Sequence, residues 1–475
     1  MSPEPSEPFR CDILVIGSGP AGQKAAIQGV KNGKSVVLVE QETKVGGACV
    51  HRGTIPSKTL RETAASLIGF RSKTGDAFKL QLNEETQISS LMTRLEYVIK
   101  AHERYMGSQL ERNGVSLWHG RAKFVDAHTV EIQKVDRTRK LVRAETIVIA
   151  VGSQPRNPDN INVDHEHILD SDSILSMIYL PVSLTVLGAG VIASEYATIF
   201  SSLGVQVTML DKTERPLAFL DPEITERFVE TFEKTGNRYI GKAAIKSCVW
   251  NGLDKVVTTL ENGEVIETEK CLFALGRIAC LKGLNVEAAG IKPTERGIIA
   301  VNEFCQTEVP HIYAAGDVIG PPSLASSSME QGRRAILHSR GLSVGKGGET
   351  LPTGIYTIPE MSSVGLTEAD AIKKFGSAVI GRASFSEVAR GQIAAIEDGM
   401  LKLVCDPEGK RVLGVHIICE GATDLVHVGQ MAIYANCDVD IFIDNIFNFP
   451  TLTEAYRVAA FDVIERRGQI SPASK

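Results

Sequence analysis

The chain has 475 residues, a formal net charge of −6 at pH 7 and a mean hydropathy of +0.01. Apolar residues make up 43% and charged residues 23%, a composition that excludes an intrinsically disordered chain. The negative charge argues against a surface that binds nucleic acid or anionic membranes. At roughly 150 residues per domain, the length predicts about three domains.

The nine cysteines are scattered along the chain and form no Cys-x-x-Cys pair. This spacing disfavours zinc ribbons and thioredoxin-type redox motifs, so we expect no metal site. No apolar run reaches the roughly 18 residues of a membrane span, and residues 1–12 lack the apolar stretch of a signal peptide. The sequence therefore predicts a cytoplasmic protein whose thiols stay reduced.

A glycine-rich turn follows the first apolar stretch. Gly17-x-Gly19-x-x-Gly22 lies between a predicted strand and a helix-like stretch, and the next strand ends in Glu40. In such a turn the first glycine permits a tight bend, the second lets a pyrophosphate approach the backbone, and the third lets the helix pack on the strand. The helix N-terminus offers N–H groups to phosphate, and the acid accepts ribose hydroxyls. The pattern predicts a dinucleotide-binding unit.

The same pattern recurs in the middle of the chain. A predicted strand leads into Gly188-x-Gly190-x-x-Ala193, and the strand after the next helix ends in Asp211. From first glycine to acid, both repeats span 23 positions, 17 to 40 and 188 to 211. Two such units predict two nucleotide-binding domains rather than one long sheet.

The acid of the second repeat bears on the choice of nucleotide. Asp211 favours NAD, because a carboxylate repels the 2′-phosphate of NADP. Lys212 and Arg215 follow at once and would offset that repulsion, although both also fit a solvated loop. NAD and NADP therefore both stay open at this point.

Three further strands are predicted to end in glycine. Those ending at Gly152 and Gly276 mark points where the chain is expected to cross between domains. The third ends in Gly316-Asp317 and so places a carboxylate where α/β sheets bind ligands, although Gly-Asp is also a common turn. After a predicted helix at 90–112 and a glycine-rich linker at 341–351, strands and helices alternate in an α+β pattern.

In this order, these elements resemble the pyridine nucleotide-disulfide oxidoreductases, a flavoprotein family that includes lipoamide dehydrogenase and glutathione reductase. The resemblance covers essentially the whole chain. It rests on seven segments: Gly17–Gly22 with Glu40, Gly46-Gly47-Ala-Cys49, Ile55-Pro56-Ser57-Lys58, the 188–195 turn, Thr307–Asp317, Tyr356–Glu360 and Pro450–Glu454.

The resemblance implies an α/β fold with two Rossmann-like dinucleotide-binding domains and a C-terminal α+β dimerisation domain. The FAD-binding domain would be discontinuous, at 1–152 and 277–346, with an NAD(P)-binding domain at 153–276 and an interface domain at 347–475. The residues expected to bind FAD are Gly17, Gly19, Gly22, Glu40, Gly46, Gly47, Cys49, Lys58, Gly152, Gly316 and Asp317. Those expected to bind NAD(P) are Gly188, Gly190, Ala193, Glu195, Asp211, Lys212 and Gly276.

The resemblance also implies roles for individual side chains. Asp317 would meet the ribityl chain of the flavin, and Lys58 would pair with Glu195 near flavin N5 as supporting catalytic groups. Cys49 has two interpretations, a redox-sensitive thiol above the flavin or a packing residue retained from a dithiol ancestor.

Two departures from the family bear on the chemistry. Disulfide-reducing members carry Cys-x-x-x-x-Cys. In this chain the first cysteine is Cys49, but Thr54 occupies the position of the second cysteine. Those members also place a histidine directly before Pro-Thr near the C-terminus, where this chain has Phe449, although Glu454 remains. A hydroxyl cannot form a redox disulfide, and a phenyl ring cannot carry a proton. Disulfide reduction by the usual route is therefore not expected.

Within the family, Gly53–Arg61, Asp170–Ser176, Leu217–Asp221 and Gly354–Glu360 most closely resemble the soluble pyridine nucleotide transhydrogenases. The loop 276–280 departs from the family pattern. This resemblance implies FAD as cofactor, NAD and NADP as substrates that bind in turn, and a homodimer or a higher homo-oligomer. Two alternatives stay open: an NAD(P)H-dependent flavin reductase or diaphorase that passes electrons to a quinone or other acceptor, and a flavoprotein with a structural role.

Overall fold

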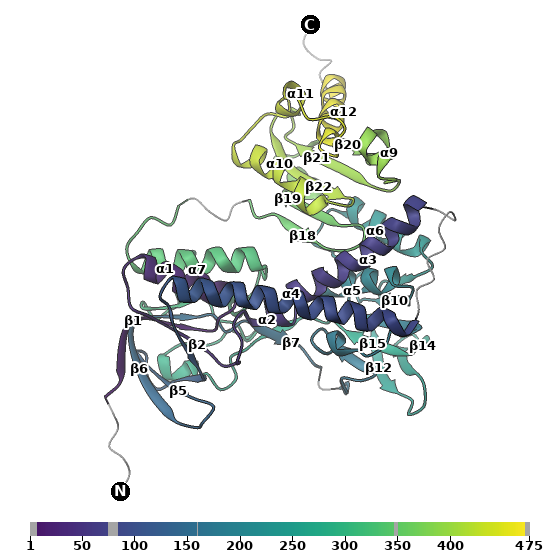
Figure 1. Cartoon of the computed structure of the whole chain (residues 1–475). Coiled ribbons are helices and arrows are strands. Elements are labelled where there is room, and N and C mark those ends of the chain that lie inside the picture. Colours follow the sequence, from purple (N-terminus) through teal and green to yellow (C-terminus); the bar gives the residue numbers. More distant parts are fainter. Residues whose placement is uncertain (1–6, 75–83, 159, 346–349, 471–475) are drawn as a thin grey trace. The chain divides into compact units, whose positions relative to one another are not determined.

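The computed structural model describes residues 7–74, 84–158, 160–345 and 350–470, and Figure 1 colours the chain along its sequence. The chain groups into two compact units. The first comprises 1–59, 92–156 and 276–347, and the second 60–91, 157–275 and 348–475. Each unit is built from three separate stretches, and the division into three domains stays a prediction.

A seven-stranded mixed sheet forms the centre of the first unit, in the order β3-β2-β1-β6-β5-β4 with β17 also paired to β6. Strand β1 runs parallel to β2 and to β6, and β17 is parallel to β6. Parallel strands covered on both faces are apolar throughout, as Ile13, Leu14 and Val15 show, each 0% exposed. The strands are β1 (Phe9–Ile16), β2 (Val36–Glu40), β3 (Ser116–His119), β4 (Arg121–Phe124), β5 (Thr129–Gln133), β6 (Arg139–Ile149) and β17 (Ile312–Ala314).

Helices cover this sheet. Helix α1 (Pro20–Lys31) begins directly after the first glycine turn and packs against α7 (Ala325–Ser339), as Figure 1 shows. Helices α2 (Gly47–His51), α3 (Thr54–Thr74) and α4 (Glu84–Arg112) follow β2 in the chain. The helix predicted at 90–112 is therefore confirmed, and α4 starts six residues earlier. In the described residues, no helix is both long enough and apolar enough to cross a membrane.

The second repeat forms a parallel sheet in the second unit. Its order is β11-β10-β9-β15-β8, so β9 lies between two parallel neighbours, just as β1 does in the sheet of the first unit. A separate antiparallel sheet, β12-β13-β14, lies in the same part of the sequence. The elements are β8 (Ile168–Asp170), β9 (Ser183–Leu187), α5 (Val191–Ser202), β10 (Gln206–Leu210), α6 (Pro222–Lys234), β11 (Arg238–Ile240), β12 (Ile245–Trp250), β13 (Val256–Leu260), β14 (Val265–Thr268) and β15 (Lys270–Phe273).

The C-terminal part is an antiparallel sheet with helices, as the α+β pattern predicted. The sheet order is β18-β19-β22-β21-β20, and α10 (Ala422–Tyr434) and α12 (Glu454–Ile470) contact it. Of the linker predicted at 341–351, residues 346–349 lie outside the described residues. The strands are β18 (Thr353–Ile355), β19 (Met361–Gly365), β20 (Val379–Ser384), β21 (Met400–Cys405) and β22 (Val412–Ile418).

Candidate functional site: two matching dinucleotide turns

The first glycine turn joins β1 to α1 and leaves space at the start of the helix. Gly17 has a φ of +102° and its amide donates to Val39 O at 2.8 Å. A Cβ on Gly17 would lie 2.3 Å from Ala150 O, and one on Gly22 would lie 1.8 Å from Gly17 O. A Cβ on Gly19, by contrast, would meet no atom within 4 Å. Gly17 and Gly22 therefore permit close packing of the backbone, and Gly19 faces open space at the helix N-terminus.

Glu40 holds this turn together from the end of β2. Its side chain is buried, and Oε2 accepts hydrogen bonds from the amide and the hydroxyl of Ser18, at 2.9 and 2.6 Å. Its Oε1 accepts from the amide of Glu42 at 2.9 Å. Because an ionised carboxylate has about four lone-pair sites, Glu40 keeps acceptor capacity for ribose hydroxyls.

The second repeat reproduces this geometry between β9 and α5. Gly188 has a φ of +109° and its amide donates to Leu210 O at 2.7 Å. A Cβ on Gly188 would lie 2.6 Å from Ala274 O, whereas one on Gly190 would meet no atom within 4 Å. Ala193, fully buried, takes the third position. The structure thus has two turns with the same open position in front of a twelve-residue helix.

Asp211 occupies the place of Glu40 in the second repeat. Its Oδ2 accepts from the amide of Ala189 at 2.9 Å, and its Oδ1 accepts from the amide and hydroxyl of Thr213 at 2.7 and 2.6 Å. Both open turns, each with its buried or half-buried acid, fit the pyrophosphate and adenosine ribose of a dinucleotide.

The two cations after Asp211 differ in what they contact. Arg215 donates to Leu220 O at 3.1 Å, to the Thr225 hydroxyl at 2.9 Å and to Ala218 O at 3.3 Å. Lys212 is exposed. The loop therefore engages Arg215 internally, and Lys212 is the better placed of the two to meet a 2′-phosphate.

The second predicted FAD-binding segment lies against the first turn. Gly46 and Gly47 have φ values of +120° and +59°, and a Cβ on Gly47 would lie 3.0 Å from Gly19 Cα. The amide of Gly46 donates to the Ser18 hydroxyl at 3.1 Å. Ser18 therefore links Glu40, the glycine turn and the start of α2.

Cys49 faces Thr54 where disulfide-reducing proteins have a second cysteine. The thiol forms a hydrogen bond with the Thr54 side chain, and Lys58 and Asp317 are close enough to act on it electrostatically. Burial is the largest influence and raises the pKa of the Cys49 thiol. All nine cysteines lie in the described residues, and none forms a disulfide. Cys49 is therefore a single thiol in an environment that disfavours the thiolate.

Three strand ends that the sequence singled out meet in the first unit. Asp317 follows β17, and its Oδ2 accepts from the Ser153 hydroxyl at 2.6 Å. The same hydroxyl accepts from Arg277 Nε at 2.8 Å, and Arg277 also donates to Ser153 O at 2.8 Å. The sequence motifs do not point to Ser153 or Arg277, although each directly follows a glycine at a predicted strand end, Gly152 or Gly276.

The two predicted supporting residues lie in different units. Lys58 is half-buried on α3, in contact with the Ser57 hydroxyl at 3.4 Å. Glu195 is 4% exposed on α5, and its Oε1 accepts from the amide of Tyr356 at 2.9 Å. Their pairing near a flavin stays a prediction.

A buried ion pair joins two segments of the resemblance. Arg61 lies 3.1 Å from Glu360 and 2.5 Å from Glu420, and the Arg61 and Glu360 side chains are 4% and 7% exposed. Burial raises the pKa of Glu360. Arg61 ends the Gly53–Arg61 motif and Glu360 ends the Gly354–Glu360 motif, but nothing in the sequence indicates that the two side chains pair.

The C-terminal motif presents an apolar ring where disulfide reductases have a histidine. Phe449 is 75% exposed, and Glu454 Oε2 accepts from the amide of Thr451 at 3.3 Å at the start of α12. Within the described residues, no group of three or more His, Cys, Asp or Glu side chains could hold a metal ion.

Comparison with known families gives one consistent result. Residues 11–332 match the model of the pyridine nucleotide-disulphide oxidoreductases, and residues 351–460 match the dimerisation domain of the same family. These matches, like the sheets above, confirm the predicted fold class.

Curated proteins and solved structures agree with this assignment. The chain is 41% identical over 456 residues to the soluble pyridine nucleotide transhydrogenase of Mycobacterium bovis, covering 96% of this chain and 97% of that protein. The protein of the same name from Yersinia enterocolitica is 38% identical, with coverage of 96% and 99%. Among solved structures, LpdA of Mycobacterium tuberculosis has a TM-score of 0.87 at 25% identity, covering 95% of this chain and 99% of LpdA.

Proposed function

Because this chain belongs to the pyridine nucleotide-disulphide oxidoreductase family, we propose that it transfers hydride between NADPH and NAD through FAD, without a redox-active disulfide. The chain is an oxidoreductase. The observation that carries the proposal is the Cys49–Thr54 contact, because the family's usual electron acceptor, a Cys–Cys pair, cannot form there. Relatives that cover almost the whole chain bear the transhydrogenase name.

FAD, when bound, would supply the hydride-transfer chemistry between the two nicotinamide nucleotides. The chain supplies position. Gly17, Gly19 and Gly22 would admit the pyrophosphate of FAD, and Glu40 its adenosine ribose. Asp317, oriented by the Ser153 hydroxyl, would accept from the ribityl chain.

The second repeat would bind the nicotinamide nucleotides, one after the other. Gly188 and Gly190 would admit the pyrophosphate, and Asp211 would accept ribose hydroxyls, with Lys212 compensating its charge when a 2′-phosphate is present. The proposal requires no side chain to act as acid or base, which agrees with Phe449 in place of a histidine.

We further propose the three-domain division and the association state. The FAD-binding part would comprise 1–152 and 277–346, the NAD(P)-binding part 153–276, and the interface part 347–475. The match to a dimerisation domain supports a homodimer. We place this homodimer in the cytoplasm, where its nucleotide substrates would be available.

Anaerobic half-reactions test the proposal. NADPH should bleach the flavin of the purified holoenzyme, and NAD added afterwards should restore its colour with formation of NADH. Steady-state rates at several concentrations of both nucleotides should give parallel double-reciprocal lines, as a ping-pong reaction requires. Flavin that NADPH does not bleach, or that NAD does not reoxidise, would refute the proposal.

An NAD(P)H-dependent flavin reductase or diaphorase is the second candidate, and Asp211 favours it. Its carboxylate would lie beside the 2′-phosphate of a bound NADP and repel it, so NADH would be the better fit. Quinone-dependent oxidation of NADH that outpaces transfer to a nicotinamide analogue would establish this activity instead. Flavin that neither nucleotide reduces would point to a structural role.

A further inference from the structure

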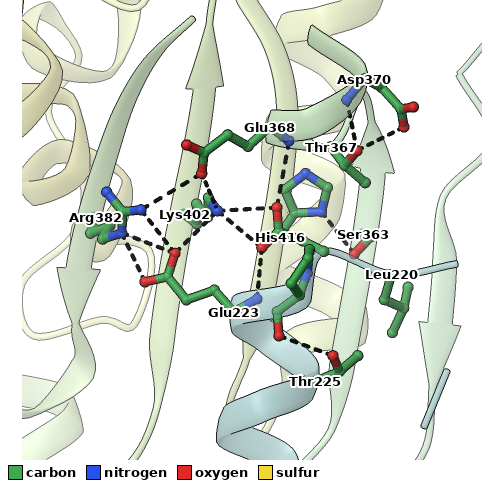
Figure 2. Close-up of polar contacts among 12 residues, drawn as sticks. Leu220, Glu223, Thr225, Ser363, Thr367, Glu368, Asp370, Arg382, Lys402 and His416 are labelled. Atoms are coloured by element: carbon green, nitrogen blue, oxygen red, sulfur yellow. Dashed lines mark hydrogen bonds and ion pairs between the residues drawn. The ribbon is translucent and has the colours of Figure 1, made fainter. Parts of the chain in front are cut away.

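A buried lysine connects the C-terminal sheet to the nucleotide-binding repeat. Lys402 lies on β21 and its side chain is 2% exposed. Its Nζ lies 3.0 and 3.1 Å from the two carboxylate oxygens of Asp221, 3.1 Å from Glu223 and 2.7 Å from Glu368. Figure 2 shows the lysine between Glu223 and Glu368. All of these residues belong to the second unit.

The other charges in this cluster do not replace Lys402 at Asp221. Arg382 pairs with Glu223 at 2.8 Å and with Glu368 at 3.7 Å, and its amide donates to Asp462. Figure 2 shows Arg382 on the far side of Glu223 and Glu368.

A histidine also lies beside the cluster, but burial disfavours its charged form. His416 is 1% exposed, and its ring nitrogens contact the Ser363 hydroxyl and Leu366 O. Its pKa is lowered by burial. Lys402 is therefore the cation that compensates the fully buried Asp221 carboxylate.

Asp221 ends the loop that begins at Asp211. Its Oδ1 accepts from the amide of Glu223 at 3.1 Å and so caps α6. Within the loop, Arg215 donates to Leu220 O, the carbonyl directly before Asp221. Anchoring Asp221 therefore also fixes the end of the loop that Arg215 braces.

The same loop is hydrogen-bonded to the Gly188–Gly190 turn. The amide of Leu217 donates to Ala189 O at 2.9 Å, and the amide of Ala189 donates to Asp211. Leu217 has a φ of +48°, a conformation that a leucine adopts only where its surroundings hold it. A continuous series of contacts thus runs from Lys402 through Asp221 and the loop to the residue between Gly188 and Gly190.

We propose that Lys402 is a positioning residue for nucleotide binding, which holds loop 211–221 and the Gly188–Gly190 turn in the shape that accepts the adenosine end of the nucleotide. The inference rests on the proposed function, which places a nicotinamide nucleotide at this turn. A buried ion pair is weak evidence for stability alone, because apolar residues of similar volume often do as well. Its geometric role is the stronger explanation for a lysine in an apolar strand.

The proposal predicts a selective kinetic effect. The nicotinamide ring reacts at the opposite end of the dinucleotide from the adenosine, so loss of the loop geometry weakens binding and leaves hydride transfer intact. In Lys402→Met, KM for NADH and NADPH should each rise about tenfold, the equivalent of about 1.4 kcal/mol of binding free energy. The kcat should stay within about twofold of wild type, and Lys402→Arg should recover part of the loss.

Three variants separate positioning from stability. Asp221→Asn keeps the Oδ1 that caps α6 but removes the negative charge that Lys402 compensates, so it should also raise KM. This variant decides between positioning and stability if Lys402→Met does not fold. Arg382→Met disturbs the same cluster without touching Asp221 and should leave KM unchanged. Val439→Ala, at a fully buried position away from the cluster, should lower Tm without changing KM.

The outcomes distinguish this inference from the function on which it rests. Unchanged KM in both Lys402→Met and Asp221→Asn, with a lower Tm, would make Lys402 a stability residue only and overturn the inference. An equal rise of KM in Val439→Ala would overturn it as well. A wild-type holoenzyme that oxidises neither NADH nor NADPH would instead refute the proposed function.

Discussion

At the scale of single residues, the glycines of the first turn have separable roles. Gly22→Ala places a Cβ 1.8 Å from a backbone oxygen, so the turn itself must shift, at a cost of about 1–3 kcal/mol. Gly19→Ala meets no protein atom and should obstruct only the bound pyrophosphate. We expect Gly22→Ala to lower the Tm of the apoprotein, and Gly19→Ala to keep that Tm but lose flavin, measured as the ratio of flavin to protein absorbance.

Gly107→Ala is the matched control for this pair. Gly107 lies on α4, where an added Cβ also meets no atom within 4 Å, so this variant should keep both Tm and flavin. A Gly19→Ala protein that purifies with full flavin would contradict the assignment of the first turn to FAD.

Cys49 provides a second prediction at this scale. Because burial raises the pKa of its thiol, Cys49 should react slowly with iodoacetamide at neutral pH, and the rate should keep rising above about pH 9. Cys49→Ser should retain hydride transfer within about twofold, since the proposed reaction needs no thiolate. Fast alkylation at neutral pH, or loss of turnover in Cys49→Ser, would show that this thiol takes part in the chemistry.

At the scale of elements, Cys49 on α2 contacts Thr54 at the start of α3, the position where disulfide-reducing members of the family carry a second cysteine. Thr54→Cys would place a thiol in contact with Cys49. We expect this variant to form a disulfide in air and to take up two additional electrons in anaerobic titration with NADPH. Thr59→Cys, five residues farther along α3, is the control and should take up none. The same electron count in wild type and Thr54→Cys would show that positions 49 and 54 are not placed to form a redox disulfide.

The elements that the sequence predicted are those whose information is local. The glycine turns, their acids and the strand ends are encoded within about thirty residues of chain, and the structure shows the two turns to be alike in φ, in hydrogen bonding and in open space. Helix ends were less exact, as at α4, because apolar spacing alone does not locate a cap.

The charged networks could not be predicted, because their partners are distant in sequence. Lys402 and Asp221 are 181 positions apart, and Arg61 and Glu420 are 359 apart. A signal was nevertheless present: Lys402 interrupts the apolar run Met400–Cys405, and a lysine in a buried strand requires a carboxylate partner. The sequence indicates that such a partner exists without indicating which acid it is.

At the scale of the whole molecule, we expect the buried thiols to make the free energy of unfolding fall at alkaline pH. Burial raises the pKa values of Cys11, Cys305 and Cys405 to about 12, 11 and 12, whereas an unfolded thiol titrates near 9.0. Above pH 9.0 the unfolded chain therefore loses protons that the folded chain keeps. The contribution of these thiols to the free energy of unfolding is therefore fully present below pH 9.0. It falls as pH rises toward 11, by up to about 1.4 kcal/mol per pH unit for each thiol.

Urea unfolding at about pH 8 and about pH 10 measures this loss. Cys405→Ala is the control: it is less stable at both pH values, but its decline between them should be smaller by one thiol's share. Equal unfolding free energies of the wild type at the two pH values would contradict the prediction.

The pairing of β17 with β6 has a consequence during synthesis. Ile312 pairs with Ile147, so the ribosome must add 165 residues after Ile147 before Ile312 is part of the chain. At roughly 5–20 residues per second, β6 waits about 8 to 33 seconds for its neighbour. In that interval a nascent chain exposes one edge of a parallel sheet while it makes the entire second glycine repeat. We expect a chaperone that binds apolar strand edges to act on this protein in that window, because β17 becomes available to β6 only after about two thirds of the chain has been translated.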